Sequence, residues 1–172
     1  MRVTSGEHRN RTLVAPPGET TRPTTDKVRL AIFNSLASTI ALDGAIVVDL
    51  FAGSGALGIE ALSRGAARCT FVERDRDALV ALRTNIAALG LDDRSTVVSS
   101  DALAWAPAIR SVDVLLADPP YGFEAWDRLL ATATAGVAVI ESDAVVEPPS
   151  GWRAVRSRRY GRTWVTTLER LG

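Results

Sequence analysis

Short apolar runs and amphipathic segments alternate along most of the chain, and this pattern predicts a parallel sheet. The runs are continuous and rich in β-branched residues, which is typical of strands covered on both faces. The segments between them carry apolar residues at helical spacing. The predicted strands are 45–50, 68–73, 95–100, 112–117 and 136–141, and the predicted helices are 57–64, 76–89 and 126–133. Repeated strand–helix units with short links indicate an α/β fold with a mostly parallel, twisted, doubly wound sheet flanked by helices.

The two ends of the chain depart from this alternation. Residues 1–23 are polar, with short alternations and a Pro-Pro-Gly turn, and predict a short basic N-terminal arm that is either extended or a small hairpin. A helix capped by residues 24–26 follows. The runs 152–160 and 162–169 pivot on a glycine and predict a C-terminal antiparallel hairpin. We therefore expect a single domain, with the arm at 1–23 and the α/β domain at 24–172.

Composition limits the class of protein. A chain of 172 residues with 47% hydrophobic residues can fill one core. No apolar run approaches the ~20 residues that span a bilayer, and the first residues lack the apolar stretch of a secretory signal. The single cysteine cannot form an internal disulfide. We expect a cytoplasmic protein, and we expect no metal site because no set of Cys and His residues has ligand spacing.

A formal net charge of zero conceals an uneven distribution of charge. Residues 1–29 contain six basic and three acidic side chains, and residues 151–172 contain six basic and one acidic. The middle of the chain therefore carries an excess of eight acidic groups. Two basic ends around an acidic middle suggest an anionic partner. An equally open interpretation is that arginines only solubilise exposed strands and tails.

A glycine-rich loop follows the first predicted strand. Gly53, Gly55 and Gly58 match the dinucleotide-binding fingerprint, and Glu73 closes the next strand at about the expected ~20 residues on. Glycines let the backbone bend and approach a ligand, and the helix N-terminus behind them presents N–H groups to an anion. That anion is either the pyrophosphate of NAD or the carboxylate of S-adenosylmethionine (SAM), and Glu73 would take ribose hydroxyls in both cases. The loop predicts an adenosine-type cofactor without deciding between the two.

A second motif, Asp118-Pro119-Pro120-Tyr121, follows the fourth predicted strand. Ligands of open parallel sheets gather beyond the carboxyl ends of the strands, so this motif should border the same crevice as the glycine loop. The two prolines fix the backbone and leave carbonyl groups available as acceptors.

This motif suits the chemistry of an amino group on a nucleic-acid base. A carboxylate and a rigid carbonyl that accept both amine hydrogens favour a more tetrahedral nitrogen, whose lone pair then faces the sulfonium methyl of SAM. Tyr121 can stack on a base that has left its helix. We therefore predict a methyltransferase with Asp118, Pro119 and Tyr121 as its catalytic residues.

The chain also resembles a known family. The resemblance is carried by Arg22-Pro23-Thr24-Thr25-Asp26-Lys27-Val28-Arg29 with Phe33-Asn34, by the loop 51–58 with 60–66, and by the Asp-Pro-Pro-Tyr motif. In these segments, and over nearly its whole length, the chain is similar to the RsmD family, bacterial methyltransferases that act on the N2 amine of a guanine in small-subunit (16S) ribosomal RNA. In the arm, Ser5-Gly6 and Asn10-Arg11 stand where the family usually has Gly-Gly and Gly-Arg.

The resemblance implies a Rossmann-like SAM-dependent methyltransferase fold and a set of site residues. The implied cofactor-binding residues are Asp49, Phe51, Gly53, Gly55, Glu73 and Asp101, the last near the adenine amine, with Thr24 and Thr25 closing over the cofactor and the RNA. The basic residues that we expect to bind the substrate are Arg9, Arg11, Arg22, Arg158 and Arg159. The implied partner is small-subunit ribosomal RNA. We hypothesise that a partly assembled 30S particle presents the base to a monomeric enzyme, because no recognition domain is predicted.

Three alternatives remain open at this point. An adenine-N6 DNA methyltransferase needs the same Asp-Pro-Pro-Tyr geometry, although the chain has no spare ~80–100 residues for a target-recognition domain. An NAD-dependent oxidoreductase explains the glycine loop but gives residues 118–121 no role. A catalytically silent RNA-binding module would use the basic ends and keep only a vestigial pocket.

Overall fold

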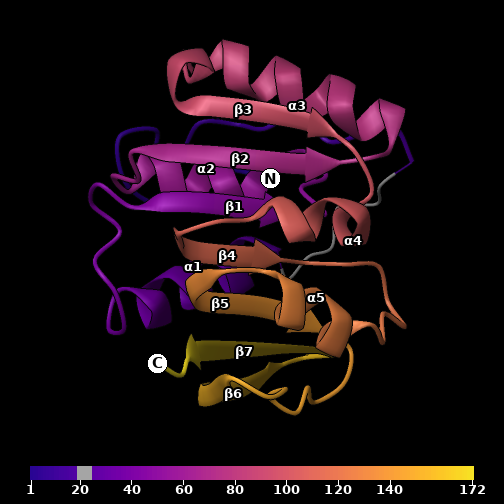
Figure 1. Cartoon of the computed structure of the whole chain (residues 1–172). Coiled ribbons are helices and arrows are strands. Elements are labelled where there is room, and N and C mark those ends of the chain that lie inside the picture. The colour runs from indigo at the N-terminus through magenta and orange to yellow at the C-terminus, as the bar shows by residue number, and fades with distance from the viewer. Residues whose placement is uncertain (19–24) are drawn as a thin grey trace.

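One sheet runs through the molecule from top to bottom of Figure 1. The computed structural model describes residues 1–18 and 25–172, and within these ranges seven strands are ordered β3-β2-β1-β4-β5-β7-β6. The first five are parallel to one another, and β7 is antiparallel to both β5 and β6. The strands are β1 (Ile46–Leu50), β2 (Arg68–Glu73), β3 (Ser95–Ser99), β4 (Val112–Ala117), β5 (Ala135–Ser142), β6 (Trp152–Tyr160) and β7 (Thr163–Arg170).

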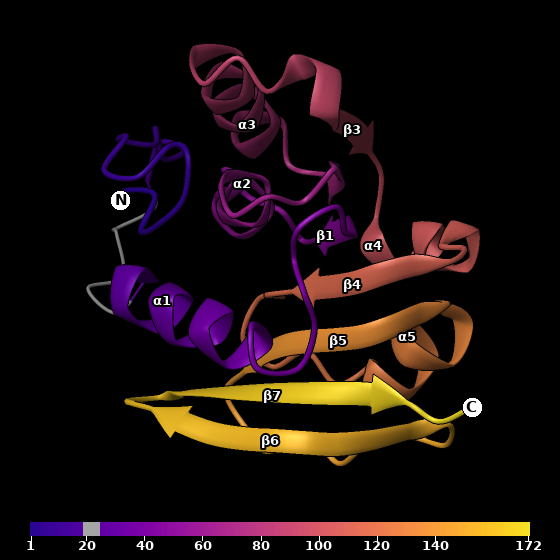
Figure 2. The same cartoon turned by 90° about the vertical axis from the view of Figure 1, so that its left-hand side faces the viewer.

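Helices cover both faces of this sheet (Figure 2). One face carries α1 (Thr25–Leu36), α2 (Ala56–Ser63) and α3 (Arg76–Ala88), and the other carries α4 (Ala102–Trp105) and α5 (Trp126–Thr132). Short 3-10 turns η1 (Asp92–Arg94) and η2 (Ala106–Ala108) complete the elements. Successive strand residues serve different cores, since Val47 packs on the α1–α3 side and Val48 on the α4–α5 side. Burial on both faces explains why the strand sequences are continuously apolar.

Each strand and helix predicted with definite bounds is present, and its ends lie within one residue of the prediction. The elements that the sequence pattern missed are η1 (residues 92–94) and the pair α4 and η2, which occupy residues 102–108. A helix of four residues is too short to show a helical period. Its N-cap residue is Asp101, whose Oδ1 accepts a hydrogen bond from the Ala104 N–H at 3.1 Å. Side-chain capping rather than periodicity therefore starts α4.

The N-terminal segment is a docked loop rather than an extended arm. It folds back on itself through an isolated bridge between Arg2 and Thr12, and the N–H of Leu13 bonds the carbonyl of Met1 at 3.0 Å. Val3 and Leu13 are buried in the core on the α1–α3 side. Of the two forms that the sequence left open, the described residues 1–18 adopt the hairpin-like one.

A fully buried carboxylate, Glu60 of α2, attaches this loop to the domain. Its oxygens accept hydrogen bonds from the N–H of Thr4 at 2.8 Å and from the Thr4 hydroxyl at 2.6 Å. Two arginines balance its charge: Arg64 Nε lies 2.8 Å away and Arg29 Nε lies 3.4 Å away. Arg29 also bonds Asp26 at 2.7 Å and a carbonyl of the N-terminal loop. One ionic network therefore joins the loop, α1 and α2.

A second buried acidic side chain, Asp49, fixes the turn from β1 to α2. Asp49 is 1% exposed, and its Oδ2 accepts a hydrogen bond from the N–H of Gly58 at 2.8 Å. That N–H belongs to the first turn of α2, where intrahelical partners are missing, and the N-cap residue Gly55 has no side chain to supply one. Burial raises the pKa of Asp49 well above its ordinary value, the bond from Gly58 opposes this, and the charges of Asp118 and Glu73 raise it further.

Removing the Glu60 carboxylate should destabilise the fold strongly. Glu60→Ala leaves Arg29, which is 3% exposed, without its buried partner. Breaking a buried ion pair from one side costs about 3–5 kcal/mol, and we expect a loss of that size in the free energy of unfolding from urea titration. The exposed control Glu147→Ala should change it by less than ~0.5 kcal/mol. Equal effects of the two substitutions would mean that the network does not hold the N-terminal loop.

The raised pKa of Asp49 should make stability depend on pH in a defined direction. Above pH ~4 this side chain ionises in the unfolded chain but stays protonated in the folded protein, because its folded pKa is higher. The unfolded state then binds fewer protons, so the free energy of unfolding falls as pH rises toward the folded pKa, by at most ~1.4 kcal/mol per pH unit. Asp49→Asn keeps an acceptor for Gly58 and removes this titration.

The measurement is the difference in unfolding free energy between the native protein and Asp49→Asn at several pH values from 4 to 7. We expect the native protein to lose stability relative to the variant as pH rises from ~4. As a control, the native protein is compared in the same way with Asp93→Asn, which changes an exposed side chain. The difference in unfolding free energy for that pair should not fall as pH rises. A native-minus-variant difference for Asp49 that stays level across the range would contradict the prediction.

Candidate active site

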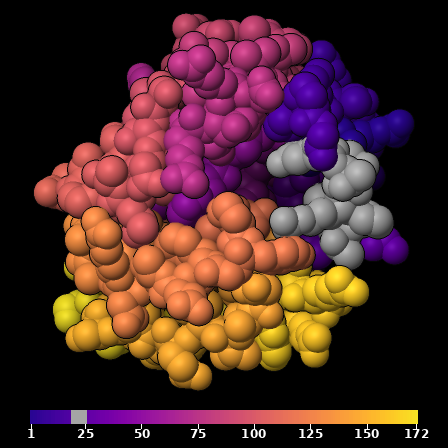
Figure 3. Space-filling view, turned by 90° about the vertical axis from the view of Figure 1, so that its right-hand side faces the viewer, coloured from indigo at the N-terminus to yellow at the C-terminus, as the bar shows by residue number. Residues whose placement is uncertain are grey.

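A cleft of about 1170 Å³ opens at the edge of the sheet where the parallel strands end. Figure 3 looks onto this edge and shows a hollow between the magenta surface above and the orange surface below. Residues after β1, β2, β3 and β4 line it, among them the segments 51–54, 73–75, 100–103 and 118–123. The glycine loop and the Asp-Pro-Pro-Tyr motif therefore share one cleft, as expected of the carboxyl ends of neighbouring parallel strands.

The three glycines of the loop have different roles. Gly55 has φ +86°, and a Cβ there would lie 2.4 Å from the side chain of Leu82 on α3. A Cβ on Gly58 would lie 2.3 Å from the ring of Phe71 on β2. Both positions are therefore required by packing behind the loop, and Gly55 is not among the residues that line the cleft. Gly53 does line it.

Glu73, at the end of β2, holds the loops of the cleft together. One carboxylate oxygen accepts a hydrogen bond from the N–H of Gly53 at 2.8 Å. The other accepts from the N–H groups of Arg74 and Asp75 at 2.7 and 2.8 Å. A carboxylate offers about four acceptor positions, so one remains for a ligand hydroxyl. Glu73 can thus keep its structural bonds while it binds a ligand.

Asp101 lies on the rim of the same cleft. While one oxygen caps α4, its Oδ2 pairs with the Arg74 guanidinium at 3.2 Å. The two side chains are 42% and 73% exposed, and solvent-exposed pairs of this kind contribute little to stability. The pair can therefore open at small cost when a ligand enters beside it.

The residues of the Asp-Pro-Pro-Tyr turn differ in their exposure to solvent. Asp118 is half-buried, Pro119 is buried, and Tyr121 is 54% exposed. The turn is anchored from the end of β5, where Asp143 Oδ2 accepts a hydrogen bond from the N–H of Gly122 at 3.1 Å. Sequence reasoning did not identify Asp143, because its link to the turn depends on strands distant in sequence.

Aromatic side chains connect the two loops directly. The ring of Phe51, in the glycine loop, meets Phe123 edge-on at a centroid distance of 5.2 Å. Phe123 in turn meets Trp126 of α5 at 4.7 Å. Such edge-to-face contacts contribute roughly 0.5–1.5 kcal/mol each beyond the area they bury. The loop after β1 is therefore packed against the loop after β4.

Asn85 of α3 was missed by the sequence analysis and joins three parts of the site. It is 2% exposed, and its Nδ2 donates to the carbonyls of Val14 and Ser54, both at 2.9 Å. Its Oδ1 accepts from the N–H of Val14 at 2.8 Å. Residues 15–18, which follow Val14, line the cleft. The available signal was a lone amide at a buried position of an amphipathic helix.

Several residues predicted to bind substrate lie away from the cleft. Arg9 and Arg11 are on the N-terminal loop, and Arg11 donates to the carbonyl of Ala88 at the end of α3, at 3.1 Å. Arg158 and Arg159 are exposed on β6. Arg22 and Thr24 lie outside the described residues. Thr25 is the first residue of α1.

The cleft has a negative lining. Its described lining residues include seven acidic side chains, among them Asp49, Glu73 and Asp118, and two basic ones. Burial and the nearby charges of Asp118 and Glu73 raise the pKa of Asp49, and without Asp49 six acidic side chains still face two basic ones. This balance favours a ligand with positive charge. Within residues 1–18 and 25–172, no group of three metal-binding side chains is present.

No helix in the part of the chain that the structure describes is both long enough and apolar enough to cross a membrane.

Known proteins share this chain's sequence and fold. The family model described as Conserved hypothetical protein 95 matches residues 1–169. The Bacillus subtilis (strain 168) protein named "Putative rRNA methyltransferase YlbH" is 39% identical over 186 aligned positions that cover 100% of both chains. The Escherichia coli (strain K12) protein named "Ribosomal RNA small subunit methyltransferase D" is 42% identical over 122 residues, which are 70% of this chain and 60% of that protein.

A solved structure from Escherichia coli, named "Putative methyltransferase yhhF", superposes with a TM-score of 0.84 at 33% identity, covering 99% of this chain and 97% of that one. The sheet order with an antiparallel β7 beside β5 is that of class I methyltransferases. Membership in a SAM-dependent family implies SAM as the cofactor, which favours the methyl donor over NAD. With a family model matched over nearly its full length, the chain belongs to the RsmD family of methyltransferases, described as Conserved hypothetical protein 95.

Proposed function

We propose that this protein transfers the methyl group of SAM to the exocyclic N2 amine of a guanine in small-subunit (16S) ribosomal RNA. The observation that carries the proposal is the shared cleft, in which the glycine loop with Glu73 and the Asp118–Tyr121 turn face each other. The name of the Escherichia coli relative supports small-subunit ribosomal RNA as the substrate. The resemblance to the RsmD family supports the N2 amine of guanine.

The residues of the cleft fit SAM in size and charge. A volume of about 1170 Å³ has room for a nucleoside cofactor together with an extruded base. The excess of carboxylates suits a ligand with sulfonium and ammonium groups. Glu73 would take the ribose hydroxyls, Asp101 the adenine edge, and the backbone at Gly53 would lie against the cofactor. When bound, SAM supplies an electrophilic methyl group.

The chain's own groups would position the amine and stabilise its charge. The carboxylate of Asp118 and the carbonyl of Pro119 would each accept one N–H, so that the nitrogen lone pair turns toward the cofactor side of the cleft. The same carboxylate would stabilise positive charge as it develops on the nitrogen. The exposed ring of Tyr121 would stack on the base. Catalysis of this kind depends on positioning and electrostatics.

Replacing Asp118 should separate chemistry from cofactor binding. In Asp118→Ala we expect methyl transfer to fall by about 10²–10³-fold, the usual loss for one group that stabilises charge in a transition state. The Kd for SAM should change little, because Glu73 and Gly53 remain. Transfer is measured with methyl-labelled SAM, and the Kd by calorimetry. Asp127→Ala, on the first turn of α5, is the control.

Transfer by Asp118→Ala at the native rate would show that another group holds the amine. A native protein that binds SAM and RNA but never transfers a methyl group would favour the silent RNA-binding module.

The substrate assignment has its own test. Labelled SAM is incubated with the protein and with protein-free ribosomal RNA, partly assembled 30S particles or duplex DNA, and the modified nucleotide is mapped. We expect label on the N2 of one guanine in 16S RNA, with faster transfer in the particle. Label in duplex DNA alone would refute an RNA substrate. Equal rates on free RNA and particles would refute presentation of the base by the particle.

A further inference from the structure

The outermost strand, β6, contains an irregularity that determines where its arginines point. Ala154 pairs with Leu168 and Arg156 pairs with Thr167, so Val155 is an additional residue in the ladder. A bulge of this kind shifts the alternation of side chains between the two faces of a strand. The residues before and after Val155 therefore follow different alternations.

The pairing after the bulge places two arginines on the α1 side of the sheet. Arg158 pairs with Val165, which belongs to the core under α1. Directly opposite residues of an antiparallel pair lie on the same face, so Arg158 faces the α1 side, and Arg156, two residues earlier, does too. Arg159 pairs with Trp164 and lies on the opposite face. The bulge thus separates Arg156 and Arg158 from Arg159.

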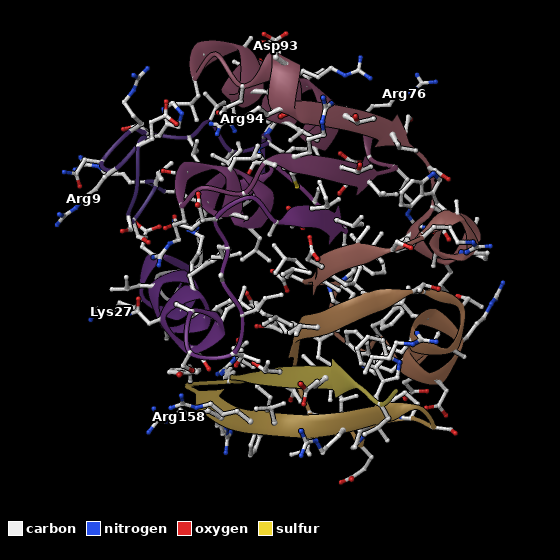
Figure 4. The ribbon with its side chains drawn as sticks, turned by 60° about the vertical axis from the view of Figure 1, so that its left-hand side comes forward. Arg9, Lys27, Arg76, Asp93, Arg94 and Arg158 are labelled. Carbon is white, nitrogen blue, oxygen red and sulfur yellow. The ribbon has the colours of Figure 1, made fainter. Side chains whose placement is uncertain are left out.

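This pair of arginines lies beside α1. The guanidinium of Arg156 is 3.4 Å from the hydroxyl of Ser35, in the last turn of the helix. Tyr160, two residues beyond Arg158 on the same face, packs against the core on the α1 side. In Figure 4, Lys27 of α1 and Arg158 project outward from the same side of the molecule. Lys27 precedes Val28 and Arg29, which line the cleft.

These cations are exposed, whereas other basic groups nearby are neutralised. Arg153 bonds Glu169 directly across the hairpin, and Arg29 is buried among carboxylates. Among the described residues, no carboxylate forms an ion pair with Arg156, Arg158 or Lys27. The strip formed by these three residues is positively charged from the last turn of α1 toward the cleft.

We propose that Arg156, Arg158 and Lys27 bind successive phosphates of the RNA strand that leads into the cleft, so that RNA approaches along the α1 face of the hairpin. Two strand residues span about 6.7 Å, a spacing comparable with that of neighbouring phosphates in an extended strand. The proposal rests on the proposed function. It also separates two of the arginines that the sequence predicted to bind substrate. Arg158 lies on the face along which RNA would approach, and Arg159 does not.

The test compares two double variants that remove equal charge. Arg156→Ala/Arg158→Ala removes the proposed contacts. Arg128→Ala/Arg159→Ala removes one exposed arginine from α5 and one from the other face of β6. Affinity for a 16S RNA fragment is measured against salt, together with KM, kcat and the Kd for SAM on 30S particles.

We expect the first double variant to bind RNA roughly tenfold more weakly and to flatten the slope of log affinity against log salt by about 1.4, which corresponds to two single-strand phosphate contacts. KM should rise with kcat and the SAM Kd unchanged. Arg156→Lys/Arg158→Lys should restore most of the affinity, because the charges remain. The control double variant should keep both the native affinity and the native slope.

An unchanged salt slope in Arg156→Ala/Arg158→Ala, or an equal loss in the control, would overturn the proposed path. Failure of the proposed function is distinguishable, because RNA affinity is measured without catalysis. A native protein that binds the fragment with the expected slope, yet methylates no guanine in 16S RNA, would refute the reaction and keep the binding surface.

Discussion

The hydrogen bond from the N–H of Gly58 to the buried carboxyl group of Asp49 is the constraint on which the cleft depends. It joins the end of the central strand β1 to the first turn of α2 over a loop whose N-cap glycine cannot bond its own helix. Packing also requires glycine at positions 55 and 58, because Leu82 and Phe71 fill the space behind the loop. With the loop held from behind, Gly53 lies against the cavity and within reach of Glu73. The wall of the cleft at this loop is therefore held in place by a buried acidic side chain and by close packing behind the loop.

Much of this arrangement follows from the sequence because its causes are local or periodic. The elements with a clear period were predicted within a residue of their bounds, and the ends of parallel strands necessarily bring residues 51–55 and 118–121 to one edge. What the sequence did not show depends on partners distant in the chain. Glu60 looks like an ordinary helix surface residue until Arg29 and Thr4 meet it, and Asn85 acquires its role only when Val14 and Ser54 arrive. The short helix α4 lacked the length that a periodic signal requires.

The charged residues have different roles in the structure from those that their distribution along the sequence suggests. Arg11 donates a hydrogen bond to a carbonyl at the end of α3, and Arg29 belongs to a buried ionic network. Part of the basic N-terminal region therefore stabilises the fold. The acidic middle of the sequence concentrates its carboxylates around the cleft. Positive charge remains exposed on the hairpin and on α1, where Arg158 and Lys27 project from the same side of the molecule. Under the proposed function, the exposed arginines would bind phosphates of the RNA and the acidic cleft would bind the positively charged cofactor.

The docking of the N-terminal loop has a practical consequence for any extension of the chain. Met1 lines the cleft, and its carbonyl accepts a hydrogen bond from the N–H of Leu13, so a residue joined ahead of Met1 would start beside the cleft. The last strand, β7, runs the other way and ends at the opposite edge of the sheet (Figure 1). A polypeptide fused ahead of Met1 would therefore emerge at the mouth of the cavity and compete with large ligands. One fused after Gly172 would leave from the far edge and keep the cavity accessible.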